Sequence, residues 1–184
     1  MIIRQATVED AHSLVNIYSY YVINTAITFE YDVPSVEEFK NRIQNTLKNY
    51  PYLVMINGNE IVGYAYASSL KERAAYQYCV ETSIYVKQGI HKMGIGKALY
   101  NELEKELAKQ GIQSMYACIT YPDEDDEYST KNSVEFHEHL GYKQVGLFPK
   151  CGYKFNRYYN VMWMLKELNP HKEDATAFIP YPNL

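Results

Sequence analysis

Two glycines one residue apart, Gly94 and Gly96, follow a strand-like segment and begin a sequence with the pattern of an amphipathic helix. The first N–H groups of a helix lack backbone partners, and the helix dipole makes the potential there positive. Glycine lets a bulky anion approach such groups closely, and Lys92 and Lys97 add positive charge. Residues 91–97 therefore predict a cradle for a pyrophosphate; tight helix packing is the alternative explanation.

Glu81 is the only carboxylate within an apolar, strand-like segment at residues 78–86. Burial disfavours the charged form of a carboxyl group and raises its pKa. A raised pKa suits a carboxylate that must accept a proton near neutral pH. A general base and a structural carboxylate bonded to neighbouring strands both fit this pattern.

The elements that must hold these residues follow from capping residues and hydrophobic periodicity. Thr7 begins a helix whose apolar stripe extends to Val22, and Ser35 begins a second. Asn57-Gly58 between two apolar runs is a strong hairpin signal. The helix that Ser35 begins covers residues 35–47, and we expect further helices over residues 91–111 and 132–140. We expect strands over residues 2–6, 52–56, 61–69, 78–86, 113–120, 142–148 and 158–165.

These elements predict an α+β fold, a mixed sheet with helices on both faces. A chain of 184 residues fits one domain, which we assign to residues 1–168. Residues 169–184 contain three prolines and no periodicity, which indicates an extended C-terminal tail.

Composition excludes several classes of function. A net charge of -4 argues against a broad basic surface for nucleic acid, and no run approaches the ~20 apolar residues that span a membrane. The three cysteines have no metal-pair spacing, and the acidic run 123–127 has no EF-hand spacing, so we expect no metal. Unpaired thiols and an N-terminus without a signal peptide predict a cytoplasmic protein.

The order of these motifs resembles the GNAT superfamily of acyl-CoA N-acyltransferases. Within it, YAYASSLKERAAYQYCVETSIYV (64–86), GIGKALY (94–100), FHEHLGY (136–142) and GYKF (152–155) resemble the phosphinothricin N-acetyltransferase group. The similarity covers roughly residues 2–167. It implies a three-layer α/β/α sandwich whose mixed, mostly antiparallel central sheet is splayed.

The resemblance implies acetyl-CoA as co-substrate, lying in the splay. Its pantetheine amides would pair with the backbone of residues 84–86, and its pyrophosphate would lie on residues 91–96. The implied cofactor-binding residues are Ile84, Tyr85, Val86, His91, Lys92, Met93, Gly94, Ile95, Gly96, Lys97, Thr130 and Ser133. Two of them depart from the family pattern: His91 replaces a Gln or Arg, and Thr130 replaces an Asn.

The resemblance also implies direct attack of an amine on the thioester, with Glu81 as the general base. An amine of pKa ~10 is about 0.1% neutral at pH 7, so its deprotonation costs roughly 4 kcal/mol. His137 is the second catalytic candidate, as a general acid to the CoA sulfur or a second base. A histidine that caps its own short helix is the alternative.

The implied acceptor is a small amino-acid-like amine of the phosphinothricin or methionine sulfoximine type. An arginine fork suits carboxylate or phosphinate oxygens, although a solvated basic loop and core packing explain the same residues. The candidate acceptor-binding residues are Phe29, Lys71, Arg73 and Tyr76, and Lys154 and Tyr153 are further candidates for contacts with a substrate or a partner subunit.

Two other functions remain open from the sequence. One is acetylation of a different amine, such as a polyamine, an aminoglycoside or a protein N-terminus. The other is a CoA-binding regulatory module without catalysis. A homodimer is expected by analogy with the resembling group.

Overall fold

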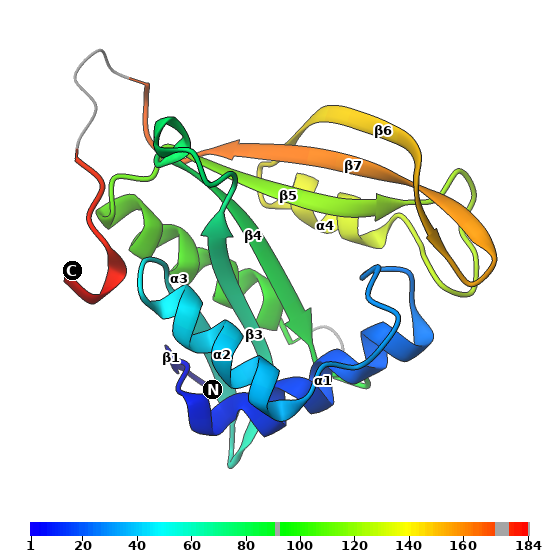
Figure 1. Cartoon of the computed structure of the whole chain (residues 1–184), viewed down its shortest axis with the longest axis horizontal. Helices are drawn as coiled ribbons and strands as arrows, with labels where there is room; N and C mark the ends of the chain where they lie inside the picture. The colour runs from blue at the N-terminus through cyan, green and yellow to red at the C-terminus, as the bar shows by residue number, and fades with distance from the viewer. Residues whose placement is uncertain (91–92, 172–176, 184) are drawn as a thin grey trace.

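The computed structural model of the chain describes residues 1–90, 93–171 and 177–183. Seven strands form one sheet in the order β1-β2-β3-β4-β5-β7-β6 (Figure 1). Every neighbouring pair is antiparallel except β4 with β5. The strands are β1 (Ile2–Gln5), β2 (Tyr52–Asn57), β3 (Glu60–Ser69), β4 (Cys79–Val86), β5 (Ser114–Tyr121), β6 (Lys143–Lys154) and β7 (Arg157–Glu167), and the helices are α1 (Ala11–Asn24), α2 (Val36–Leu47), α3 (Ile95–Lys109) and α4 (Asn132–His139).

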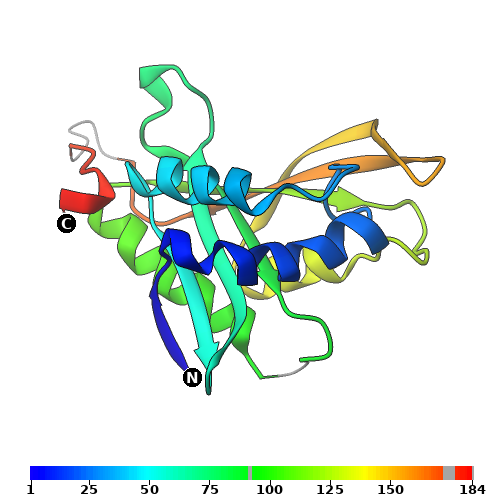
Figure 2. The same ribbon diagram turned by 60° about the horizontal axis from the view of Figure 1, so that its bottom comes forward.

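The helices cover both faces of the sheet, as the sequence predicts. Helices α1 and α2 pack on one face of β2, β3 and β4, while α3 packs on the other (Figures 1 and 2). Leu99, Leu103 and Leu107 of α3 are fully buried and share a core with Val134 of α4. Burial of these apolar side chains is the main force that holds the layers together.

The sheet divides between β4 and β5. These two strands pair only over Cys79–Glu81, whereas β3 and β4 pair over seven residues, Gly63–Ser69 with Val80–Val86. Beyond Glu81 the strands diverge, which Figure 1 shows clearly. The expected splay is therefore present, and β4 from Thr82 to Val86 has no paired strand on the side of β5.

Local sequence signals explain two of the element boundaries. The Ser35 hydroxyl accepts a hydrogen bond from the Glu38 N–H and begins α2. Gly58 adopts a φ of 61° in the β2–β3 hairpin, a conformation that costs other residues more than glycine. Strand β6 is longer than the predicted 142–148, because a bulge between Phe148 and Gly152 lets the pairing resume.

The described part of the C-terminal segment lies against the domain. The Ile179 N–H donates to the carbonyl of Gln110, and the buried Gln110 amide donates to the carbonyls of Asn49 and Ile179. Among residues 1–90, 93–171 and 177–183, no helix combines the length and the apolar character that crossing a membrane requires.

Candidate active site

A small cavity lies in the splay, next to a larger groove. The cavity has a volume of about 60 Å³ and is bounded by side chains of β4, β5, α3 and α4. The groove has a volume of about 470 Å³ and extends to the N-terminal end of α3. Ile27, Ile84 and Ser133 line both. The two spaces are therefore adjacent, and together they mark a path from the sheet to the glycine-rich turn.

The backbone of β4 supplies one wall of this path. The Lys87 N–H donates to the Val62 carbonyl of β3, and backbone direction alternates along a strand. The N–H and C=O groups of Ile84 and Val86 therefore face the splay. The Tyr21 hydroxyl donates to the Val86 carbonyl at 2.6 Å and accepts from the Val86 N–H at 3.3 Å. Of these two residues, Ile84 is the one whose backbone N–H and C=O groups can pair with a bound ligand.

The two glycines at the start of α3 have different structural tasks. Gly94 has a φ of 70° and precedes the first helical residue, and a Cβ placed there would meet no atom within 4 Å. A Cβ on Gly96 would lie 3.0 Å from the ring of Phe136 on α4. Gly94 thus keeps the groove open, while Gly96 permits close packing of α3 and α4.

The remaining predicted cofactor residues divide by position. Met93, Gly94, Gly96 and Lys97 line the groove, Thr130 lines the small cavity, and Ser133 lines both. Ile95 lines the groove and is 3% exposed, so its side chain belongs mainly to the core. Tyr85 lines the small cavity from β4. His91 and Lys92 lie outside the described residues.

Replacement of Gly94 by valine tests the glycine-rich turn. A β-branched residue is strained at positive φ, and its side chain would enter the open groove. We expect the KM for acetyl-CoA to rise about tenfold or more, equivalent to at least ~1.4 kcal/mol of binding. Gly58→Val is the matched control, because Gly58 has a similar φ of 61° but lies in the hairpin. An equal rise in both variants would contradict the assignment.

Glu81 lies where the splay begins. It is the last β4 residue that pairs with β5, and Thr82 and Ser83, which follow it, line the small cavity. The side chain is half-buried, and burial raises the pKa of its carboxyl group. The Lys71 ammonium opposes that rise. A carboxylate with a raised pKa next to the splay fits the expected general base.

Replacement of Lys71 by alanine tests the electrostatic setting of Glu81. Because the Lys71 charge lowers the pKa of Glu81, its loss raises that pKa further. We expect the acidic limb of the kcat–pH profile to move to higher pH. Lys48→Ala, at the exposed C-terminal end of α2, removes an equal charge and should leave the limb in place. If the acidic limb stays in place in the Lys71 variant, the limb does not report the ionisation of Glu81.

His137 is 3% exposed and lies in the wall of the small cavity. Its Nδ1 atom lies 2.6 Å from the Ser133 carbonyl oxygen, and its Nε2 atom lies 3.0 Å from the Tyr100 hydroxyl. Burial lowers the pKa of the imidazole. Both ring nitrogens are therefore occupied by protein partners, and the neutral form is favoured.

The candidate acceptor residues come from two separate connections, with Phe29 between α1 and α2 and the other three between β3 and β4. Lys71 is near enough to Glu81 to influence its pKa, while Arg73 and Tyr76 are exposed on the β3–β4 connection. The tip of the Phe29 ring lies against Gly152 of β6, where an added Cβ would be 2.1 Å from it. Phe29 thus joins the α1–α2 loop to the β6–β7 hairpin.

The Lys154 side chain does not reach toward an acceptor or a partner subunit. The residue is 2% exposed, and its ammonium group donates to the carbonyls of Val22, Thr25 and Thr28 at 2.8–2.9 Å. It donates hydrogen bonds to carbonyl groups at and just beyond the C-terminal end of α1, where positive charge is favourable. Sequence reasoning missed this role, together with those of Tyr21 and Tyr100, because each depends on contacts between distant segments.

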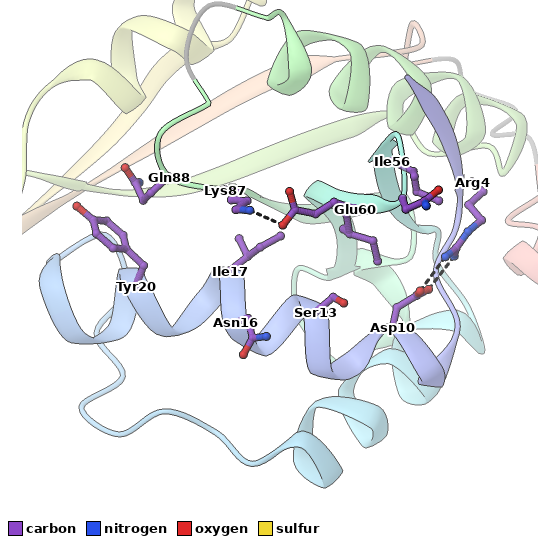
Figure 3. Close-up of a pocket in the computed structure, with 12 residues that line it drawn as sticks. Arg4, Asp10, Ser13, Asn16, Ile17, Tyr20, Ile56, Glu60, Lys87 and Gln88 are labelled. Atoms are coloured by element: carbon purple, nitrogen blue, oxygen red, sulfur yellow. Dashed lines mark hydrogen bonds and ion pairs between the residues drawn. The ribbon is translucent and has the colours of Figure 1, made fainter.

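A larger cavity of about 590 Å³ lies elsewhere, between α1 and the β2–β3 hairpin (Figure 3). Its charged groups are paired with each other: Arg4 bonds Asp10 at 2.7 Å, and Lys87 bonds Glu60. No residue of the small cavity in the splay lines it. Size alone therefore does not identify the site where the sequence motifs converge.

Comparison with known proteins agrees with the geometry. A family model described as an acetyltransferase (GNAT) domain matches residues 3–163. The phosphinothricin N-acetyltransferase of Streptomyces coelicolor is 32% identical over 90% of this chain and 95% of its own length. The L-methionine sulfoximine/L-methionine sulfone acetyltransferase of Salmonella typhimurium is 27% identical over 93% and 96%.

A solved structure is also similar over nearly the whole chain. It is the GNAT superfamily phosphinothricin acetyltransferase from Sinorhizobium meliloti in complex with AcCoA. The TM-score is 0.87 and the sequence identity 32%, with 99% of this chain and 96% of that chain covered.

Proposed function

The chain belongs to the GNAT family of acetyl-CoA-dependent N-acetyltransferases, and on that premise we propose that it acetylates the amine of a small amino-acid-like acceptor of the phosphinothricin or methionine sulfoximine type. The names of its relatives support this class of acceptor. The observation that carries the proposal is the splayed sheet, with Glu81 at the point of divergence and two adjacent pockets that reach the start of α3.

The residues of the path fit acetyl-CoA. The Ile84 backbone offers a donor and an acceptor to an amide of the pantetheine arm, as a neighbouring strand would. The start of α3 offers N–H groups to a pyrophosphate, with Lys97 exposed beside it. When bound there, acetyl-CoA supplies an activated acetyl group as a thioester.

The acceptor attacks the thioester as its neutral amine, whose nitrogen must lose one proton when the amide forms. We assign to Glu81 the role of accepting the proton that the amine loses as its N–C bond forms. The C–S bond breaks, and CoA leaves as a thiolate. A positioned general base typically contributes ~10²–10⁴-fold to such a step. A raised pKa makes Glu81 a stronger base than an ordinary carboxylate.

Positive charge near Glu81 favours an acceptor that also carries an anionic group. Lys71 interacts with Glu81 electrostatically, and Arg73 lies on the same exposed connection. A carboxylate or phosphinate on the acceptor would be attracted there while its amine faces Glu81. A polyamine would be repelled by the same charges.

We further propose a homodimer formed through β6, and a cytoplasmic location. Strand β6 is an edge of the sheet, and Val145, Leu147 and Phe148 on it are 51%, 45% and 54% exposed. Apolar side chains on an unpaired edge favour association with a second copy. The three cysteines are free thiols, which suits a reducing compartment.

A panel of amines tests the proposed acceptor class. CoA release from acetyl-CoA would be measured with phosphinothricin, methionine sulfoximine, ordinary amino acids, spermidine, an aminoglycoside and a peptide N-terminus. We expect the highest kcat/KM with the first two. A preference for spermidine or the aminoglycoside would overturn the acceptor class, and saturable CoA binding without acetylation of any amine would favour a regulatory module.

A further inference from the structure

Tyr21 reaches from α1 to the splayed part of the sheet. The residue is 9% exposed, and its ring packs edge to face on the ring of Tyr85 with centroids 5.1 Å apart. Its hydroxyl ends on the backbone of β4, where it donates to the Val86 carbonyl at 2.6 Å and accepts from the Val86 N–H at 3.3 Å. One side chain therefore bonds both backbone groups of Val86.

These two groups are the ones through which Val86 would pair with a neighbouring strand. A strand residue that faces its neighbour offers one N–H and one C=O to it, and a hydroxyl can accept and donate at the same time. Strand β5 does not pair with β4 beyond Glu81. The Tyr21 hydroxyl thus takes the place of the missing strand at Val86.

The position of Val86 makes this contact relevant to the co-substrate. Ile84 and Val86 face the same side of β4, and both line the groove together with Tyr21. Alternate residues of a strand lie about 6.6 Å apart, and the pantetheine arm of CoA carries two amides along one chain. Such an arm can pair with both residues as a neighbouring strand would, but Tyr21 leaves only Ile84 free to pair.

We propose that Tyr21 limits the affinity of the site for CoA by withholding the backbone of Val86 from the pantetheine arm. This inference rests on the proposed path of acetyl-CoA between β4 and β5. Acetyl-CoA and the product CoA share the arm, so Tyr21 weakens the binding of both. Differences in affinity at one site lie mostly in the rate of dissociation, and the restriction therefore speeds the release of CoA.

The Tyr21 hydroxyl has no hydrogen left for a ligand in the groove. Burial raises the pKa of Tyr21, and hydrogen bonds to the Val86 backbone and the Gln88 side chain oppose that rise. The phenol therefore stays neutral, and its single hydrogen goes to the Val86 carbonyl. Loss of the hydroxyl removes a competitor for Val86 and takes no donor away from CoA.

Tyr21→Phe tests the proposal, with CoA alone as the probe. Phenylalanine keeps the ring that packs on Tyr85 and frees both backbone groups of Val86. We expect the Kd for CoA, measured by titration calorimetry without an acceptor, to fall about threefold to tenfold, as one net hydrogen bond would give. The free variant should melt at a lower temperature than the original protein, and saturating CoA should raise its melting temperature by more.

Tyr18→Phe is the matched control on the same helix. Tyr18 is 5% exposed, and its ring also packs edge to face on Tyr85, with centroids 4.9 Å apart. Its hydroxyl lies 2.7 Å from the Thr28 hydroxyl, and the residue lines neither the small cavity nor the groove. Tyr18→Phe should also lower the melting temperature, because a buried hydrogen bond is lost, but it should leave the Kd for CoA within about twofold.

Hydrogen exchange at the Val86 amide gives a second readout, which a purely structural role of Tyr21 would not produce. In Tyr21→Phe we expect this amide to exchange fast in the free protein and slowly once CoA is bound. If the original protein does not bind CoA, the proposed function fails. If it binds CoA but Tyr21→Phe binds it no more tightly, or CoA does not slow exchange at Val86 in that variant, Tyr21 does not restrict the site and the transferase assignment stands.

Discussion

Replacement of Glu81 by glutamine should lower kcat by about 10²–10⁴-fold, the typical contribution of a positioned general base. Glutamine keeps the size and hydrogen-bonding capacity of the side chain but cannot accept the amine proton at neutral pH. The KM for acetyl-CoA should change little, because Glu81 lies at the closed end of the splay and does not line the groove.

The pH dependence gives the same prediction a second readout. The general base must be ionised, so kcat should rise with pH through the raised pKa of Glu81. That limb should disappear in the glutamine variant. A raised pKa also means that the folded protein binds this proton more tightly than the unfolded chain, so stability falls as pH rises from about the ordinary value of 4.5 through the folded value. At neutral pH, Glu81→Gln should therefore be as stable as the original protein or more so.

Glu72→Gln supplies the control, since Glu72 is an exposed carboxylate on the β3–β4 connection. It should leave both kcat and the acidic limb unchanged. Full turnover in Glu81→Gln would remove Glu81 from the reaction and leave it as a structural carboxylate.

The elements of the fold could be predicted from the sequence because their signals are local. Ser35 with Glu38, Asn57-Gly58 and the four-residue repeat of leucines from Leu99 each act within one turn or one hairpin. The end of β6 could not be placed, because its continuation past Phe148 depends on Lys150 at a φ of 52°, where the Asn160 side chain accepts its N–H. That contact links residues ten positions apart.

The site was predictable to the extent that its residues lie in contiguous motifs. Glu81 and Ile84 share one strand, and Gly94 and Gly96 share one helix start. The partners of these residues are distant in the sequence. Tyr21 meets Val86 across 65 positions and Tyr100 meets His137 across 37. No spacing rule relates such pairs, so the single-residue role for His137 had to be reconsidered once Tyr100 was in place.

Lys154 is the clearest example of a residue whose type suggests one task and whose position imposes another. Its ammonium group is surrounded by three carbonyl oxygens of the segment from Val22 to Thr28. Burial lowers its pKa, and the charge of nearby Glu30 opposes that effect. Ile27, which lines both the small cavity and the groove, lies in this segment. Lys154 therefore fixes the position of a segment that lines the site, although its own side chain does not line the small cavity or the groove.

Lys154→Met should destabilise the protein by about 3 kcal/mol or more, because three buried carbonyls lose their donor at about 1–3 kcal/mol for each group left unsatisfied. In a domain of this size that corresponds to a fall in melting temperature of roughly 10 °C. Thermal unfolding at neutral pH would measure it. Loosening of the segment that carries Ile27 should also raise the KM for acetyl-CoA.

Two control variants test whether the loss of stability comes from the buried ammonium group of Lys154. Lys143→Met changes an exposed lysine of the same strand and should leave the melting temperature within about 2 °C. Lys154→Arg should fail to restore stability, since a planar guanidinium is larger and cannot direct its donors at three converging carbonyls as an ammonium does. If methionine is tolerated as well at position 154 as at position 143, those carbonyls must have found water instead. The loop that Lys154 joins to β6 is then held by other contacts, among them that of Phe29 with Gly152 and the hydrogen bond from the Tyr31 hydroxyl to the Tyr153 carbonyl.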